Sequence, residues 1–156
     1  MKIISLILVT CSFFFTQKID KADFYVVLES DSESKISAKI ATLDKLNTSK
    51  DKDAYIGTLT MKHSKFMKTP KEKIAVFRSG KDMLEKSIRS APNNGEYRFL
   101  RLIIQENSPK ILKYNSNIEE DIKIIQETFN SLDGLVKKVI KSYASGSKNL
   151  SAELLK

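Results

Sequence analysis

Residues 69–90 read TPKEKIAVFRSGKDMLEKSIRS, and this stretch decides the expected fold. Thr69 stands at the N-cap position of a helix, Pro70 at its first position and Glu72 three residues after the cap. That order is the pattern of a capping box with the favoured proline. Four apolar residues then recur at helical spacing: Ile74, Phe77, Leu84 and Ile88. The stretch therefore predicts a helix over 70–90 with one buried face.

The same periodicity runs through the rest of the chain after Lys18. Helices are expected near 20–30, 33–47, 52–67, 70–90, 95–106, 109–115, 118–131 and 133–144. Ser108-Pro109 repeats the cap-then-proline pattern, and Asn117 precedes acidic residues as a third expected cap. No part of this region shows a sustained two-residue alternation bounded by hairpin turns. The expected class is all-α, with short connections that favour antiparallel helical hairpins in one compact domain.

Composition narrows the function classes. The chain has 156 residues, a formal net charge of +8, five glycines, three prolines and one cysteine. That length suits a single core. Few glycines and prolines argue against collagen and disordered tracts, and a lone cysteine excludes a disulfide scaffold or a zinc–cysteine cluster.

The N-terminus predicts export. Lys2 is followed by thirteen uncharged residues, Ile3 to Phe15, which is the pattern of a secretory signal peptide. As a helix this run rises about 20 Å, short of the ~30 Å hydrocarbon core of a bilayer. The expected organisation is a signal peptide over 1–16, an all-helical domain over 17–145 and a short C-terminal tail over 146–156, in a periplasmic or extracellular protein.

Two other interpretations of the N-terminus stay open. Leu8 to Cys11 resembles a bacterial lipobox, in which Cys11 would be lipidated and anchor the protein, although the threonine before Cys11 is atypical. The segment could instead be an amphipathic or buried first helix, but it offers no polar face.

Residues 54–94 carry a specific pattern. Gly80, Leu84, Ser87 and Pro92 follow a small–large–small–proline order, and Tyr55-Ile56-Gly57 precedes them. This pattern resembles a tetratricopeptide hairpin, in which small residues let two helices approach closely. The sequence departs from the family period between Gly57 and Gly80, and no second copy follows. The resemblance therefore implies a tetratricopeptide-like or irregular α-solenoid arrangement and not a regular array.

A second resemblance covers the run from Glu96 to Arg101, Ser108-Pro109 and Asp121. These residues look like those of a group of uncharacterised exported bacterial helical proteins. The resemblance implies a bacterial protein associated with the cell envelope, and it implies no activity.

The sequence gives little support for a catalytic site or a metal site. His63 is the only histidine, and it lies among cationic residues, so a surface or partly packed helix residue is the expected role. Asp51 and Asp53 lack the glycine and terminal glutamate of a calcium loop. The acids at 119–121 open a helix, where they stabilise its dipole. No catalytic residue, metal site or cofactor is expected.

Arg98 and Arg101 are the most informative pair. They lie three residues apart on a strongly apolar stretch, so at least one guanidinium should be buried and paired. The expected partners are Glu96, Glu106 and Asp121. A structural ion-pair network is the main interpretation; an anionic ligand held by the two arginines and a pair lying in solvent are the alternatives.

The lysines predict little about partners. The densest cluster is Lys62, Lys65, Lys68, Lys71 and Lys73. It is not interleaved with aromatic residues, so it is interpreted as a solvated face and nucleic acid is not expected as a partner. Weak contact with an anionic membrane surface stays open.

The sequence therefore predicts an exported, non-enzymatic binding or scaffolding protein that presents a helix-lined groove to a protein or peptide. The candidate groove residues are Tyr55, His63, Glu96, Arg98, Arg101 and Asp121. The alternatives are a small hydrolase or transferase that uses carboxylates and arginines, and a basic structural protein of the envelope.

Overall fold

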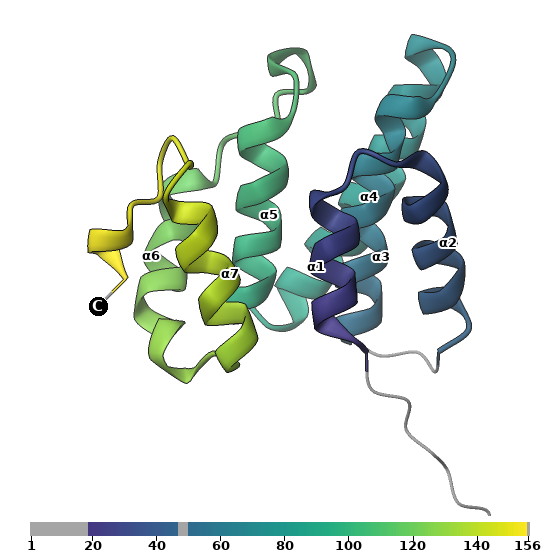
Figure 1. Ribbon diagram of the computed structural model, residues 1–156. Helices are drawn as coiled ribbons and strands as arrows, with labels where there is room; N and C mark the ends of the chain where they lie inside the picture. The colour runs from purple at the N-terminus through teal and green to yellow at the C-terminus, as the bar shows by residue number, and fades with distance from the viewer. Residues whose placement is uncertain (1–18, 47–49, 156) are drawn as a thin grey trace, which may run out of the picture.

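The computed structural model describes residues 19–46 and 50–155 as a set of packed helices (Figure 1). The α-helices are α1 (Lys21–Glu29), α2 (Glu33–Asp44), α3 (Lys50–His63), α4 (Pro70–Ser90), α5 (Gly95–Asn107), α6 (Ile118–Thr128) and α7 (Gly134–Ala144). Short 3-10 turns are η1 (Ser64–Phe66), η2 (Lys110–Leu112), η3 (Phe129–Ser131) and η4 (Ala152–Leu154). No strand occurs in the described residues, and the all-α class is confirmed. The predicted signal peptide, with Cys11, lies outside these residues.

One of the three predicted caps forms. The Glu72 N–H donates to Thr69 Oγ1 at 3.2 Å, and the Thr69 N–H donates to Glu72 Oε2 at 2.9 Å. The prediction for Ser108 is wrong, because its hydroxyl donates back to the Ile104 carbonyl at 2.6 Å and ends α5. Asn117 precedes α6 but makes no side-chain cap; its amide donates to the Glu120 carboxylate.

The helix predicted over 109–115 is also wrong, since only the single turn η2 forms there. Pro109 enters that turn with an extended ψ of 137°, and Lys113 leaves it in the left-handed region with φ 48°. A non-glycine residue in that region interrupts a right-handed helix. The segment is therefore a loop that projects beyond the end of α5 (Figure 1).

The α3–α4 hairpin brings two helix backbones into close contact. A Cβ built on Gly80 would lie 2.5 Å from the Gly57 carbonyl oxygen, and one on Gly57 would lie 2.6 Å from the Gly80 carbonyl oxygen. Only glycine permits two helix backbones to come this close. The close helical hairpin is confirmed, and its assignment to the tetratricopeptide class stays a prediction.

Two groups of helices pack side by side (Figure 1). Helix α3 contacts α1, α2 and α4, while α5 contacts α6 and also packs against α3 and α4. Helix α1 additionally contacts α7, which joins the two groups. The largest fully buried side chains come from both groups: Phe24, Tyr55, Leu59, Leu84, Phe99, Leu102, Ile125 and Ile140 are among them. Within the described residues, no helix is both long and apolar enough to span a bilayer.

The segment predicted as a C-terminal tail folds onto the domain. Leu150 and Leu155 are buried, and the Glu106 carboxylate of α5 accepts hydrogen bonds from Ser147 and Asn149. Tyr143 donates to the same carboxylate at 2.6 Å. Burial raises the pKa of Glu106, but these hydrogen bonds outweigh burial and hold its pKa below the usual range.

Candidate binding groove

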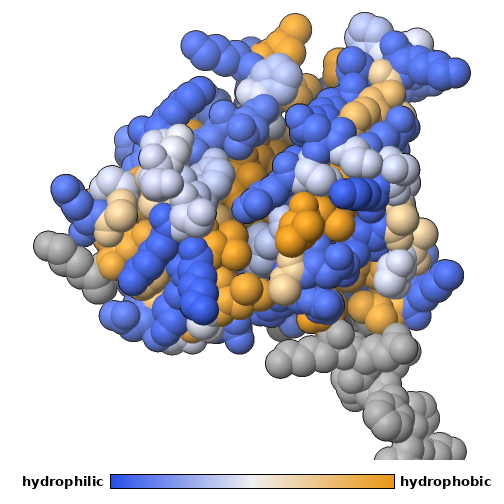
Figure 2. All heavy atoms as spheres, viewed as in Figure 1, coloured by the Kyte–Doolittle hydropathy of each residue, from blue (hydrophilic) through white to orange (hydrophobic). Residues whose placement is uncertain are grey.

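A cavity of about 720 Å³ lies between the two groups of helices. Its first wall comes from the end of α1, the α3–η1 junction and the first half of α4; its second wall comes from α5, η2 and α7. Figure 2 shows apolar atoms in the hollow between the groups. Leu28, Met61, Phe77, Phe99 and Ile104 are buried residues that line it. We call this cavity the groove.

Large apolar side chains are exposed at the rim of the groove. Ile111 of η2 is 85% exposed and Ile74 of α4 is 38% exposed, and both line the groove. Ile74 belongs to the helical stripe that predicted a buried face. The structure places it at the rim because the first half of α4 faces the groove and not a neighbouring helix. Exposed apolar residues around a cavity are typical of a binding surface.

The polar side chains in the walls bond to their own backbone. Ser64, Asn107 and Ser108 each donate to a carbonyl three or four residues earlier, at 2.6–2.8 Å. The Asn107 amide also donates to the Tyr143 hydroxyl at 3.4 Å, so these donors are used within the walls. The walls offer mainly apolar surface to an occupant.

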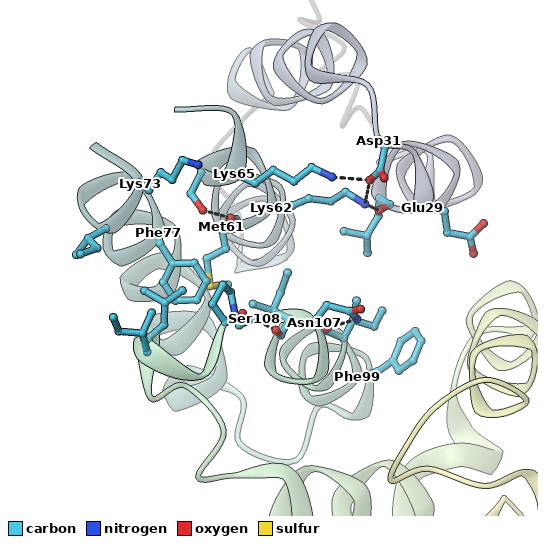
Figure 3. A pocket seen from close by; sticks show the side chains of 18 of the residues that line it. Glu29, Asp31, Met61, Lys62, Lys65, Lys73, Phe77, Phe99, Asn107 and Ser108 are labelled. Atoms are coloured by element: carbon cyan, nitrogen blue, oxygen red, sulfur yellow. Dashed lines mark hydrogen bonds and ion pairs between the residues drawn. The ribbon is translucent and has the colours of Figure 1, made fainter. Parts of the chain in front are cut away.

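Charge along the groove is one-sided (Figure 3). Lys62, Lys65 and Lys73, here called the basic edge, lie on the first wall. Lys65 Nζ lies 2.5 Å from Asp31 Oδ1, whereas Lys73 forms no ion pair with another described residue. Glu29 and Asp31 also lie on this wall. The Glu29 carboxylate points away from the lysines in Figure 3, whereas the Asp31 carboxylate pairs with Lys62 and Lys65. None of the described lining residues from α5, η2 and α7 is charged.

Lys62 is fixed by the end of α1. Its Nζ donates to the Leu28 carbonyl at 2.5 Å and lies 3.7 Å from Asp31 Oδ1. Burial lowers the pKa of Lys62, with nearby Lys65 acting in the same direction and Asp31 opposing. The end of α3 is thereby tied to the end of α1 across the first wall.

The predicted pair Arg98 and Arg101 forms a buried ion-pair network with Asp121. Arg101 Nε and Nη2 donate to the two Asp121 oxygens at 2.8 and 2.6 Å, and Arg98 Nη1 donates at 3.2 Å. Asp121 is fully buried, and burial raises its pKa while the guanidinium groups oppose that rise. Two permanently charged partners hold the carboxylate ionised at neutral pH. Asp121 is thus confirmed as a partner of the arginines.

The other predicted partners of the arginines lie elsewhere. Glu96 accepts hydrogen bonds from Tyr55 at 2.5 Å and Tyr25 at 3.0 Å, and Lys21 Nζ lies 2.5 Å from it. Glu106 holds the C-terminal segment. The outer partners of the arginines are instead Glu85, 3.0 Å from Arg101, and Glu120, 3.0 Å from Arg98. Burial and the Glu96 charge raise the pKa of Tyr55.

His63 lies apart from both clusters. Its Nε2 is 3.0 Å from Ser37 Oγ and 3.8 Å from Glu33 Oε1, and its ring is partly buried. The six predicted site residues therefore do not meet in one place, and none of them lines the groove. The described residues contain no group of three or more His, Cys, Asp or Glu side chains placed to hold a metal ion.

The ion-pair network is connected to the groove through Tyr114. The Tyr114 hydroxyl donates to Glu85 at 2.6 Å, and its ring packs edge-on against Phe77 at 5.6 Å between centroids. Glu85 in turn binds Arg101. Because Phe77 lines the groove, the network fixes the second wall relative to the first.

The sequence predicts a helix-lined groove but not the residues that line it. Of the predicted lysine cluster, Lys62, Lys65 and Lys73 line the groove, and so the prediction of a solvated face is wrong for these three. Gln105 was also missed: it is buried, and neither of its amide atoms has a partner among the described residues.

Fold and groove together define an all-helical protein with a preformed apolar cavity between two helical groups. Comparison with protein-family models, curated proteins and solved structures finds no match to this chain.

Proposed function

We propose that this protein is a non-enzymatic binding or scaffolding module that holds an apolar segment of a protein or peptide in the groove. The observation that carries the proposal is an open, apolar cavity of about 720 Å³ with exposed Ile74 and Ile111 at its rim. Ligand sites in proteins are usually preformed apolar cavities of roughly 300–1,000 Å³. Leaving large apolar residues in water is unfavourable, and an occupant would remove that surface from solvent.

The burial of the charged cluster favours binding over catalysis. A catalytic carboxylate must reach its substrate, whereas both oxygens of Asp121 are taken by arginines in the interior. The charged cluster described in the groove walls, Asp31 with Lys62 and Lys65, is likewise engaged in ion pairs. A hydrolase or transferase built on the arginines and acids therefore has less support than a binding module.

Export is part of the proposal and rests on residues 1–16. We expect the mature protein to begin after residue 15 or slightly later, in the periplasm or outside the cell. N-terminal sequencing of the protein from fractionated cells tests this. A chain beginning at Met1 in the cytosolic fraction contradicts export, and an acylated N-terminus at Cys11 would replace secretion by membrane anchoring.

Selection of peptides from a random displayed library tests the groove. Ile103→Trp places a large side chain in the groove, and Val26→Trp is the matched control, because Val26 is exposed and does not line it. Peptides selected on the unmodified protein should bind Ile103→Trp at least tenfold more weakly than Val26→Trp, provided circular dichroism shows both variants folded. Equal binding to the two variants, or no enriched peptide, overturns the proposed function.

A further inference from the structure

We infer that the occupant of the groove is an amphipathic helix with acidic residues along the side that faces the basic edge. This inference rests on the proposed function and names the chemistry of its partner. It draws on three features of the groove: the satisfied polar groups of its walls, the wall on which its charges lie and the spread of its lysines along that wall.

The walls favour a helical occupant. Backbone N–H and C=O groups that enter an apolar cavity must find hydrogen-bond partners. The described residues contain no strand edge, and Ser64, Asn107 and Ser108 already donate within their own helices. An extended peptide would therefore bury unsatisfied backbone groups. A helix satisfies its own backbone and can insert an apolar face.

The basic edge favours acidic residues on one side of that helix. Lys62 and Lys65 share the Asp31 carboxylate, which lines the same wall, so two ammonium groups face one acid there. The Lys73 ammonium has no acidic partner among the described residues. The opposite wall contributes only uncharged lining residues. Complementarity therefore predicts carboxylates against the basic edge and neutral residues against α5 and α7.

The spread of the lysines favours a helix over an anionic lipid. Lys62 and Lys65 come from the end of α3 and from η1, while Lys73 comes from α4, and the three lie along one wall in Figure 3. A fatty acid presents a single charged group at one end of its chain. A helix presents carboxylates at successive turns, which matches charges distributed along an edge.

Three synthetic peptides test the inference. Each has fifteen residues and the same leucines at i, i+3, i+4 and i+7, and one flank carries glutamate, glutamine or lysine. By fluorescence anisotropy, the glutamate peptide should bind at least tenfold more tightly than the lysine peptide in low salt. This ratio should shrink as salt rises, because exposed charges are screened. Ile103→Trp should weaken binding of the glutamate peptide.

Charge reversal locates the interaction. Lys73→Glu should reduce the preference for the glutamate peptide at least threefold. Lys35→Glu makes the same change in net charge on α2, which does not line the groove, and should leave the preference unchanged. An equal effect of the two variants contradicts the role of the basic edge.

The outcomes separate this inference from the proposed function. Equal binding of the glutamate and lysine peptides, lost in Ile103→Trp, overturns the acidic helix and leaves groove binding standing. Displacement of the glutamate peptide by sodium palmitate at lower concentration than by unlabelled glutamate peptide overturns the helix in favour of an acyl chain. Absence of binding by all three peptides also overturns the inference, while the library selection decides groove binding independently.

Discussion

Replacing Gly80 by alanine should destabilise the protein, although the same change stabilises most helices. In a helix interior, alanine is favoured over glycine by about 0.5–1 kcal/mol. Gly80 lies in the middle of α4, where its Cβ would lie 2.5 Å from the Gly57 carbonyl oxygen and 2.7 Å from the Met61 backbone nitrogen. Both atoms belong to the backbone of α3 and cannot rotate away.

The size of the effect follows from this distance. Ordinary contact of a Cβ begins near 3.4 Å, so the backbones of α3 and α4 must separate by about 0.9 Å at the crossing. A gap of roughly 0.5–1 Å forfeits about a quarter to a half of the dispersion energy of the atoms that face it. Overpacking of this kind costs about 1–3 kcal/mol. After subtraction of the helix-propensity gain, the expected net loss in the free energy of unfolding is about 1 kcal/mol.

Urea unfolding followed by circular dichroism measures this loss. Gly134→Ala is the matched control, because a Cβ on Gly134 at the start of α7 meets no atom within 4 Å. The double variant Gly57→Ala/Gly80→Ala should lose less than the sum of the single losses, since one separation of the helices accommodates both methyl groups. A Gly80→Ala protein as stable as Gly134→Ala would refute the close crossing.

Three further changes test the interior and the C-terminal segment. Asp121→Ala should lower the free energy of unfolding by about 3–5 kcal/mol, because it leaves two buried guanidinium groups short of a partner. Glu120→Ala changes a half-exposed residue and should cost less than about 1 kcal/mol, so similar urea midpoints for the two variants would contradict the prediction. Gln105→Met keeps a long unbranched side chain and removes two unpartnered amide atoms, so the free energy of unfolding should rise by about 1 kcal/mol, and a fall of that size would reveal a partner for the amide. The lowered pKa of Glu106 contributes stability above the ordinary carboxyl range near pH 4, and this contribution disappears as the pH falls through the folded-state pKa. Protection factors for hydrogen exchange in residues 146–155, corrected for the intrinsic rate at each pH, should therefore fall below pH 4, less so in Glu106→Gln, and identical pH profiles would exclude Glu106 as the cause.

Local signals predicted the helices well. The capping box at Thr69 depends on residues within one turn, and it forms as expected. The wrong prediction of a helix over 109–115 also has a local cause. Lys113 adopts a left-handed backbone conformation, which lysine rarely does and which the sequence therefore does not predict. Ser108 shows the limit of such signals: a serine before a proline suits the start of one helix and the end of another, and only the fold decides between them.

The candidate site could be predicted only in part. The apolar surroundings of Arg101 indicated a buried charge, and Asp121 is its partner. Choosing among three acids required the packing of α5 against α6, which residue spacing does not contain. The lining of the groove could not be predicted for the same reason. Ile74 has the periodicity of a core residue, and its position at the rim depends on the distance between two groups of helices.

The glycine crossing also has a mechanical consequence. Pro70 lies ten residues before Gly80, so the start of α4 is about 15 Å from the point where α4 crosses α3. If α4 tilted by about 10° about the crossing, its first residues would move by about 2.5 Å, given this helical rise. The aperture between α4 and η2 would thus depend on the crossing, which lies beside Met61 of the groove wall, and substitutions at Gly57 or Gly80, which do not line the groove, would alter which peptides fit.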